Sequence, residues 1–92
     1  MKQKINVFTL EHLEECLKDS NYYKKKDEMD KSLSIIERFK DEYNIRKTDV
    51  ITSLAFTIYL DKNSDNFLDN NINILKMLLK DVACKVDVET II

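Results

Sequence analysis

Glycine, proline and tryptophan are all absent from this chain of 92 residues. At average usage, a chain of this length would carry about six glycines and about five prolines. Glycine supplies the left-handed backbone of tight turns and helix C-caps, and proline sets turns and stops helices. Their absence disfavours a turn-rich β-sandwich and favours helices joined by short loops of Asn, Asp and Ser.

Residues that carry chemistry are also scarce, with two cysteines and one histidine. Cys16 and Cys84 show no metal or redox spacing, so we expect free thiols. His12 and Cys16 stand four residues apart, but two ligands do not make a metal site. Without glycine there is no phosphate-cradling loop and no nucleophile elbow. We therefore expect no metal, no cofactor and no catalysis.

Long apolar runs are missing as well. The segment 1–10 lacks the apolar core of a secretory signal, and Val50–Leu60 is too short to span a bilayer. The net charge of −2 does not favour non-specific coating of nucleic acid, which needs excess positive charge. These features predict a cytoplasmic protein without a membrane partner, made of a single helical domain over residues 1–92.

Apolar residues recur at the spacing of a helix face in several segments. Before the first of them, Gln3–Phe8 alternates as a short strand would, and Thr9 can cap the helix that follows. The second helix is predicted over Glu28–Tyr43, with Asn44 as a left-handed C-cap. The stripes of the first, second and final helices are Leu10, Leu13 and Leu17; Met29, Leu33, Ile36, Phe39 and Tyr43; and Leu68, Ile72, Leu75, Leu79, Val82 and Val86.

A third helix is predicted from Thr48, which would cap it, through Leu60. One face of this helix would carry Val50, Ile51, Leu54, Ala55 and Ile58. Phe56, Tyr59 and Leu60 occupy much of the rest, so the helix is apolar nearly all round. Such helices are buried centrally or at an interface. The run is also rich in β-branched residues, which leaves a buried strand as an alternative.

The tail over Val86–Ile92 alternates weakly and offers a pairing partner for Gln3–Phe8. If the two segments do not pair, the tail simply frays. The predicted fold is therefore mostly α, a small bundle of about four helices. A short two-stranded ribbon formed by the termini is an optional addition to that bundle.

The segment Asp61–Asp69 resembles the calcium loop of EF-hand proteins. The family's ligand positions 1, 3, 5 and 9 fall on Asp61, Asn63, Asp65 and Asp69. Position 6 is Asn66 where the family has glycine, and position 12 is Ile72 where it has a bidentate glutamate. Because the strongest ligand is missing, we expect a solvated loop and no calcium binding tighter than about millimolar.

The segment Ser34–Asn63 resembles the two helices of ribbon-helix-helix regulators, in which a preceding strand forms half of a dimeric ribbon that enters the major groove. The positions that match that helical core are Phe39, Ile45, Val50, Ile51, Leu54 and Ile58. Here the preceding segment, Lys24–Asp30, is a charged run, and the better strand precedes a different helix. The resemblance implies a dimeric DNA-binding regulator with phosphate contacts from Lys24, Lys25, Lys26, Arg46 and Lys47.

The leading prediction is a small non-catalytic protein–protein interaction module, of the kind that phages and plasmids use as inhibitors or regulators. Its partner would be another protein or its own copy in a homodimer. The excess apolar surface of the third helix motivates this prediction, with Phe56 and Tyr59 as the expected anchors, because aromatic residues dominate interface energetics. The DNA-binding regulator is the alternative.

Overall fold

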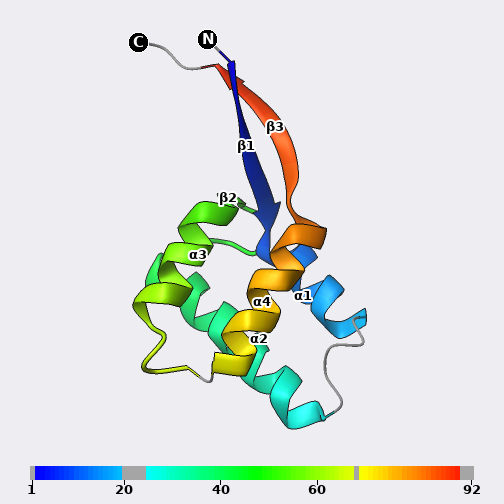
Figure 1. Cartoon of the computed structure of the whole chain (residues 1–92), viewed down its shortest axis with the longest axis vertical. Helices are drawn as coiled ribbons and strands as arrows, with labels where there is room; N and C mark the ends of the chain where they lie inside the picture. The colour runs from blue at the N-terminus through cyan, green and yellow to red at the C-terminus, as the bar shows by residue number, and fades with distance from the viewer. Residues whose placement is uncertain (1, 20–24, 68, 90–92) are drawn as a thin grey trace.

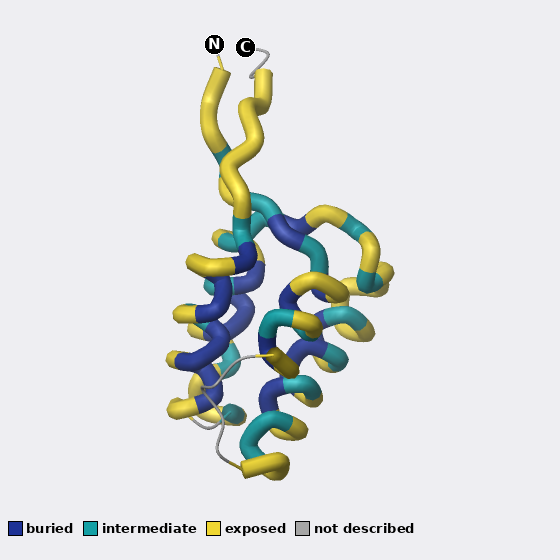
Figure 2. Tube along the Cα trace, turned by 90° about the vertical axis from the view of Figure 1, so that its right-hand side faces the viewer, coloured by how far each residue is buried: buried dark blue, intermediate teal, exposed yellow. Residues whose placement is uncertain are grey.

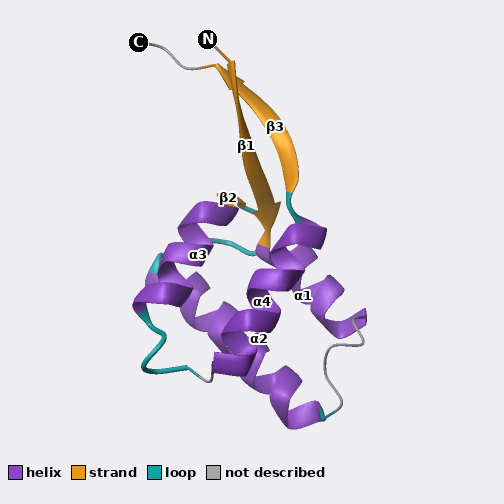
Figure 3. Ribbon diagram, in the orientation of Figure 1, coloured by secondary structure: helices purple, strands orange, loops and turns teal. Residues whose placement is uncertain are grey.

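The computed structural model describes residues 2–19, 25–67 and 69–89 of the chain. This described part contains four helices and one three-stranded antiparallel sheet with strand order β2-β1-β3. The helices gather at one end, and β1 and β3 extend from them as a ribbon (Figure 1, Figure 3). In chain order the elements are β1 (Lys2–Thr9), α1 (Leu10–Asp19), α2 (Lys26–Glu42), β2 (Val50–Thr52), α3 (Ser53–Lys62), α4 (Asp69–Val82) and β3 (Cys84–Glu89).

The prediction of a mostly α bundle is wrong. Helices hold 62% of the described residues and strands hold 21%, which makes the fold α+β. The ribbon formed by the terminal segments is only one part of the sheet, because β1 also pairs with β2 along its other edge. That second pairing joins Val7 to Thr52, Phe8 to Ile51 and Thr9 to Val50.

The segment Val50–Thr52 is a strand and not the first turn of a helix. The predicted helix start at Thr48 is therefore wrong, and α3 begins at Ser53. The hydroxyl oxygen of Thr52 caps α3 by accepting a hydrogen bond from the backbone N–H of Ala55 at 3.2 Å. Val, Ile and Thr suit a pleated strand, and pairing with β1 holds all three residues in extended backbone.

The side of α3 that faces the core is set by a cluster of aromatic rings. Phe56 meets Phe8 of β1 with ring centroids 5.7 Å apart and Phe39 of α2 at 5.0 Å, both edge to face. This cluster draws one side of α3 inward and leaves Leu54 and Ile58 exposed. The predicted face is thus divided, since Ile51 lies buried in β2 while Leu54 and Ile58 lie on the solvent side of α3.

Several local predictions are confirmed. The hydroxyl oxygen of Thr9 accepts a hydrogen bond from the backbone N–H of His12 at 3.2 Å, as expected of a helix cap. Asn44 adopts the left-handed conformation with φ of 51°, where many proteins use glycine. The α1 stripe of Leu10, Leu13 and Leu17 is fully buried.

The packing of α4 against α2 combines an apolar stripe with one buried amide. The Asn71 side-chain nitrogen donates to the hydroxyl oxygen of Ser32 at 2.7 Å and to the carbonyl oxygen of Glu28 at 2.9 Å. These bonds fix the position of α4 along α2, since a buried amide without partners is costly. Val86, predicted as the last residue of the α4 stripe, lies in β3, and Leu68 lies outside the described residues.

Burial divides the molecule into two regions (Figure 2). The inner sides of the helices and the base of the sheet form one core, and the β1–β3 ribbon is largely exposed. Leu75 of α4 is fully buried in that core.

We expect Leu75→Ala to lower the free energy of unfolding by about 2–5 kcal/mol, because the change removes buried methyl groups and leaves a cavity. Urea unfolding followed by circular dichroism measures this loss. Met77→Ala, on the exposed side of the same helix, is the control and should cost less than about 0.5 kcal/mol. Equal costs for the two variants would contradict the burial of the α4 stripe.

Candidate interaction surface

The outer side of α3 and the neighbouring β2 carry large apolar side chains in solvent. Val50, Leu54 and Ile58 are 69%, 68% and 56% exposed. Leu54 and Ile58 are one helical turn apart, so they lie on the same stripe of α3. Between this stripe and the C-terminal end of α2 lies a groove of about 420 Å³, and its lining residues are Phe39, Tyr43, Ile45, Val50, Ile51, Ala55 and Ile58. We call the groove and the Leu54–Ile58 stripe the α3 groove.

The loop that forms one wall of the α3 groove is held by local hydrogen bonds. After the left-handed turn at Asn44, the backbone N–H of Ile45 donates to the carbonyl oxygen of Lys40 at 3.0 Å. The Asp49 carboxylate accepts from the backbone N–H of Arg46 at 2.9 Å and pairs with its guanidinium at 3.1 Å. The hydrogen bonds from Arg46 lower the pKa of the Asp49 carboxyl. Ile45, beside this turn, packs against the core.

The two anchors predicted on α3 lie inside the protein. Phe56 and Tyr59 are 0% and 2% exposed. Burial raises the pKa of the Tyr59 hydroxyl above its ordinary value. Both rings contact Phe39, which lines the α3 groove, and the large apolar side chains of the same helix that are exposed are Leu54 and Ile58. No local sequence signal identifies Leu54 and Ile58 as the exposed pair, because the side of α3 that is buried is set by contacts with β1 and α2.

The basic residues predicted to contact phosphate do not gather into one patch. Lys24 lies outside the described residues, and Lys25 and Lys26 are exposed where α2 begins. Arg46 and Lys47 follow the other end of α2, which spans 17 residues or about 25 Å. At that end, both basic side chains are engaged in ion pairs within the chain.

Lys47 ties three segments of the chain together. Its ammonium lies 3.3 Å from a carboxylate oxygen of Glu14 in α1 and 2.8 Å from one of Glu37 in α2. Hydrogen bonds from Lys47 and Lys40 lower the pKa of Glu37, and Glu37 and Glu14 raise the pKa of Lys47. Lys47 therefore links the loop after α2 to α1 and α2, and its positive charge is paired with two carboxylates of the same chain.

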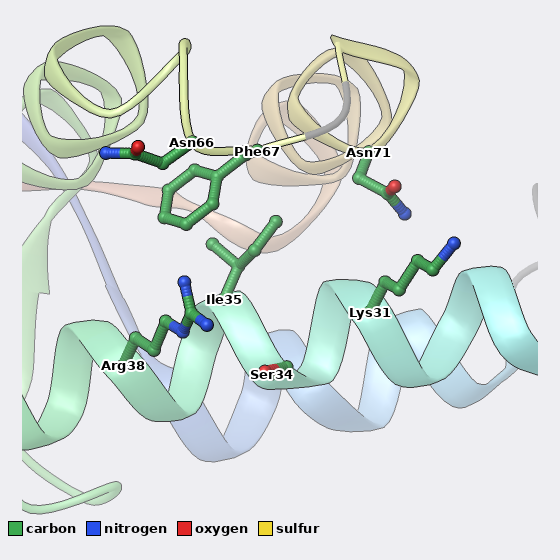
Figure 4. Close-up of a pocket in the computed structure, with 7 residues that line it drawn as sticks. All are labelled: Lys31, Ser34, Ile35, Arg38, Asn66, Phe67 and Asn71. Carbon is green, nitrogen blue, oxygen red and sulfur yellow. The ribbon is translucent and has the colours of Figure 1, made fainter.

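A second depression of about 270 Å³ lies between α2 and the segment that leads into α4. Figure 4 shows Phe67 and Ile35 closing it from opposite sides, with Lys31 and Arg38 projecting from α2 beside it. Both basic side chains are exposed. The amide of Asn71 is already bonded to α2, so it is committed to holding the helices together. We interpret this depression as a seam between packed elements.

The EF-hand-like segment has a different conformation from a cation loop. Asp61 lies in the last turn of α3, where its carboxylate pairs with Lys76 of α4. Asn63 is the C-cap of α3, and its side-chain nitrogen donates to the carbonyl oxygen of Tyr59 at 2.9 Å. Ile72, at the position of the family's glutamate, is buried. Over residues 2–19, 25–67 and 69–89, no group of three or more His, Cys, Asp and Glu side chains is placed to hold a metal ion.

We expect calorimetric titration with calcium to show no stoichiometric binding tighter than about millimolar, because Asp61 is paired with Lys76 and position 12 offers no carboxylate. A micromolar isotherm that is lost in Asp61→Ala would contradict this expectation. Asp30→Ala, in α2, controls for the removal of one carboxylate elsewhere.

We expect Lys47→Met to lower the free energy of unfolding at pH 7 by less than about 1 kcal/mol, because the pairs with Glu14 and Glu37 are partly exposed. The lowered pKa of Glu37 means that its pairing stabilises the fold above the ordinary carboxyl pKa. That contribution disappears as the pH falls through the folded-state pKa.

The difference between wild type and Lys47→Met should therefore shrink below about pH 4. Thermal unfolding at pH 7 and at pH 3 measures it, with Lys31→Met, the same change at an exposed lysine of α2, as the control. An equal loss of stability at pH 7 and at pH 3 would show that Lys47 acts through the packing of its aliphatic side chain and not through its charge.

Among the described helices, none has the length and apolar character needed to cross a membrane. No protein-family model matches the chain, and comparison with characterised proteins and with solved structures finds no significant match.

Proposed function

We propose that this chain is a non-catalytic interaction module that binds a protein partner through the α3 groove. The observation that supports the proposal is the exposure of Val50, Leu54 and Ile58, each more than half accessible to solvent, beside a groove with an apolar lining. Large apolar side chains that gather in this way mark interaction sites more often than they do when scattered singly.

The shape of the surface favours a macromolecular partner. The α3 groove is open, and the Leu54–Ile58 stripe continues it along the outside of α3. An apolar side chain from a partner helix or strand would fill the groove, while neighbouring partner residues would cover the stripe. Removing this apolar surface from water favours such a complex, and the gain must exceed the freedom of motion that both partners lose on association.

The proposal includes a cytoplasmic location for this activity. Cys16 and Cys84 are both free, and Cys84 is exposed. A reducing compartment keeps exposed thiols in this state. A regulator or inhibitor acting there needs only to occupy a surface of its partner, and the exposed apolar residues of α3 suit that role.

We expect Ile58→Asp and Leu54→Asp to abolish capture of the partner while leaving helicity intact, because both side chains are exposed and a buried carboxylate in the interface would be unpaired. The measurement is quantitative affinity capture from lysate of cells that carry the gene, with circular dichroism as the folding check. Met77→Asp makes the same change at an exposed residue of α4 and should capture as wild type does.

Equal capture by wild type and Ile58→Asp would reject the α3 groove as the site. Retention of DNA that falls steeply with salt, and is lost when Lys25 and Lys26 are changed to Gln, would instead support the DNA-binding regulator.

A further inference from the structure

The β1–β3 ribbon is amphipathic across its two faces. Residues directly opposite one another in an antiparallel pair point to the same side of the sheet. One face therefore carries the pairs Gln3 with Val88, Ile5 with Val86, and Val7 with Cys84. The other face carries the pairs Lys2 with Glu89, Lys4 with Asp87, and Asn6 with Lys85. Polar and apolar residues are thus sorted as they would be if one face were covered.

The β3 half of that face is exposed, Ile5 and Val7 of β1 are half-buried, and the outer edge of the ribbon is free of any described strand. Val86 and Val88 are 43% and 38% exposed, and every residue of β3 is exposed. The strand order β2-β1-β3 makes β3 an edge, so half of its backbone N–H and C=O groups point away from β1. A ribbon of two strands is marginally stable alone, and a free edge is a template for another strand.

The sequence of β3 is complementary to itself when it is reversed about Val86. We infer that two copies of this chain pair their β3 edges antiparallel, around a two-fold axis that passes by Val86. The resulting sheet has the strand order β2-β1-β3-β3-β1-β2. Across the new junction, Val86 lies opposite Val86 of the second copy, Cys84 opposite Val88, and Lys85 opposite Asp87.

This register is the one that satisfies both faces of the ribbon. Two Lys85–Asp87 pairs of opposite charge form on the polar face, and Val86, Val88 and Cys84 extend the apolar face across the junction. A centre at Lys85 places Lys85 opposite Lys85. A centre at Asp87 pairs Lys85 with Glu89 twice but places Asp87 opposite Asp87, and like charges directly opposite are destabilising. A register shifted by one residue places Val86 of one copy opposite Asp87 of the other, so apolar and charged side chains would share one face.

A second copy fits this edge better than an unrelated strand, because the complementary charges are in β3 itself. The two-fold arrangement is isologous, which is the commonest symmetry of soluble homo-oligomers. The ribbon extends well beyond the helices (Figure 1, Figure 2), so the two helical bodies would lie at opposite ends of the four central strands. This interface is separate from the α3 groove, which would remain free for another partner.

The first test is the oligomeric state of the full chain and of Lys85→Glu. We expect sedimentation equilibrium to show a monomer–dimer equilibrium with a dissociation constant of about micromolar, because a single strand edge buries less area than a standard interface. Lys85→Glu places like charges opposite each other twice and should weaken the dimer at least about tenfold. Within its own ribbon Lys85 faces the neutral Asn6, so the change breaks no cross-strand ion pair there.

Two matched variants separate this interface from other causes. Lys18→Glu makes the same charge change on α1 and should leave the dimer unaffected. Ile58→Asp, which blocks the α3 groove, should also leave it unaffected. A dimer that is lost in Ile58→Asp and kept in Lys85→Glu would overturn this inference while supporting the α3 groove as a self-association site. A chain that stays monomeric at about millimolar concentration would overturn it outright.

The second test reads the register in a background that carries Cys16→Ser and Cys84→Ser. There, Val86→Cys brings two thiols opposite each other at a Cα separation of about 4.5–5.5 Å, within the range of a disulfide. Mild oxidation should then link the dimer covalently, and adding Lys85→Glu should prevent it. Val88→Cys in the same background lies opposite position 84, which no longer carries a thiol, and should not link. Linking through residue 88, or no linking through residue 86, would contradict the register.

Discussion

The contact between Phe8 and Phe56 is the interaction on which the arrangement of sheet and helices depends. Phe8 is the buried side chain of β1, and its ring meets Phe56 edge to face at 5.7 Å. Ile51, paired with Phe8 across the sheet, is buried beside it, so the core is continuous from β1 and β2 to α3. Because β1 is also the central strand, this one contact orients both edges of the sheet and directs the ribbon away from the helices.

The sequence predicted those elements whose pattern is local. In α1, the spacing of Leu10, Leu13 and Leu17 and the Thr9 cap are sufficient, since burial follows one stripe. The run from Val50 was misassigned because a segment that is apolar on every side has no periodicity to read. Thr48 and Thr52 are both competent caps, and the choice between them depends on pairing with β1, which lies more than 40 residues away.

The candidate surface was harder to predict than the fold for a related reason. The hydropathy of the segment indicated that α3 carries more apolar surface than its neighbours can bury, but it did not show which side of the helix would be exposed to solvent. The aromatic rings of α2 and β1 decide that side, and they select Phe56 over Leu54. The ion pairs of Lys47 could not be predicted from the sequence for another reason, because its partners come from α1 and α2 and are brought together only by folding.

The antiparallel pairing of Lys2 with Glu89 has a mechanical consequence. These residues lie together at the tip of the ribbon, so a tension applied between them loads the cross-strand hydrogen bonds one pair at a time (Figure 1). Such a ribbon opens by peeling, from Lys2 and Glu89 toward Val7 and Cys84, at low force. The force reaches the helical core only after the two strands have separated, so the ribbon unfolds before the rest of the protein.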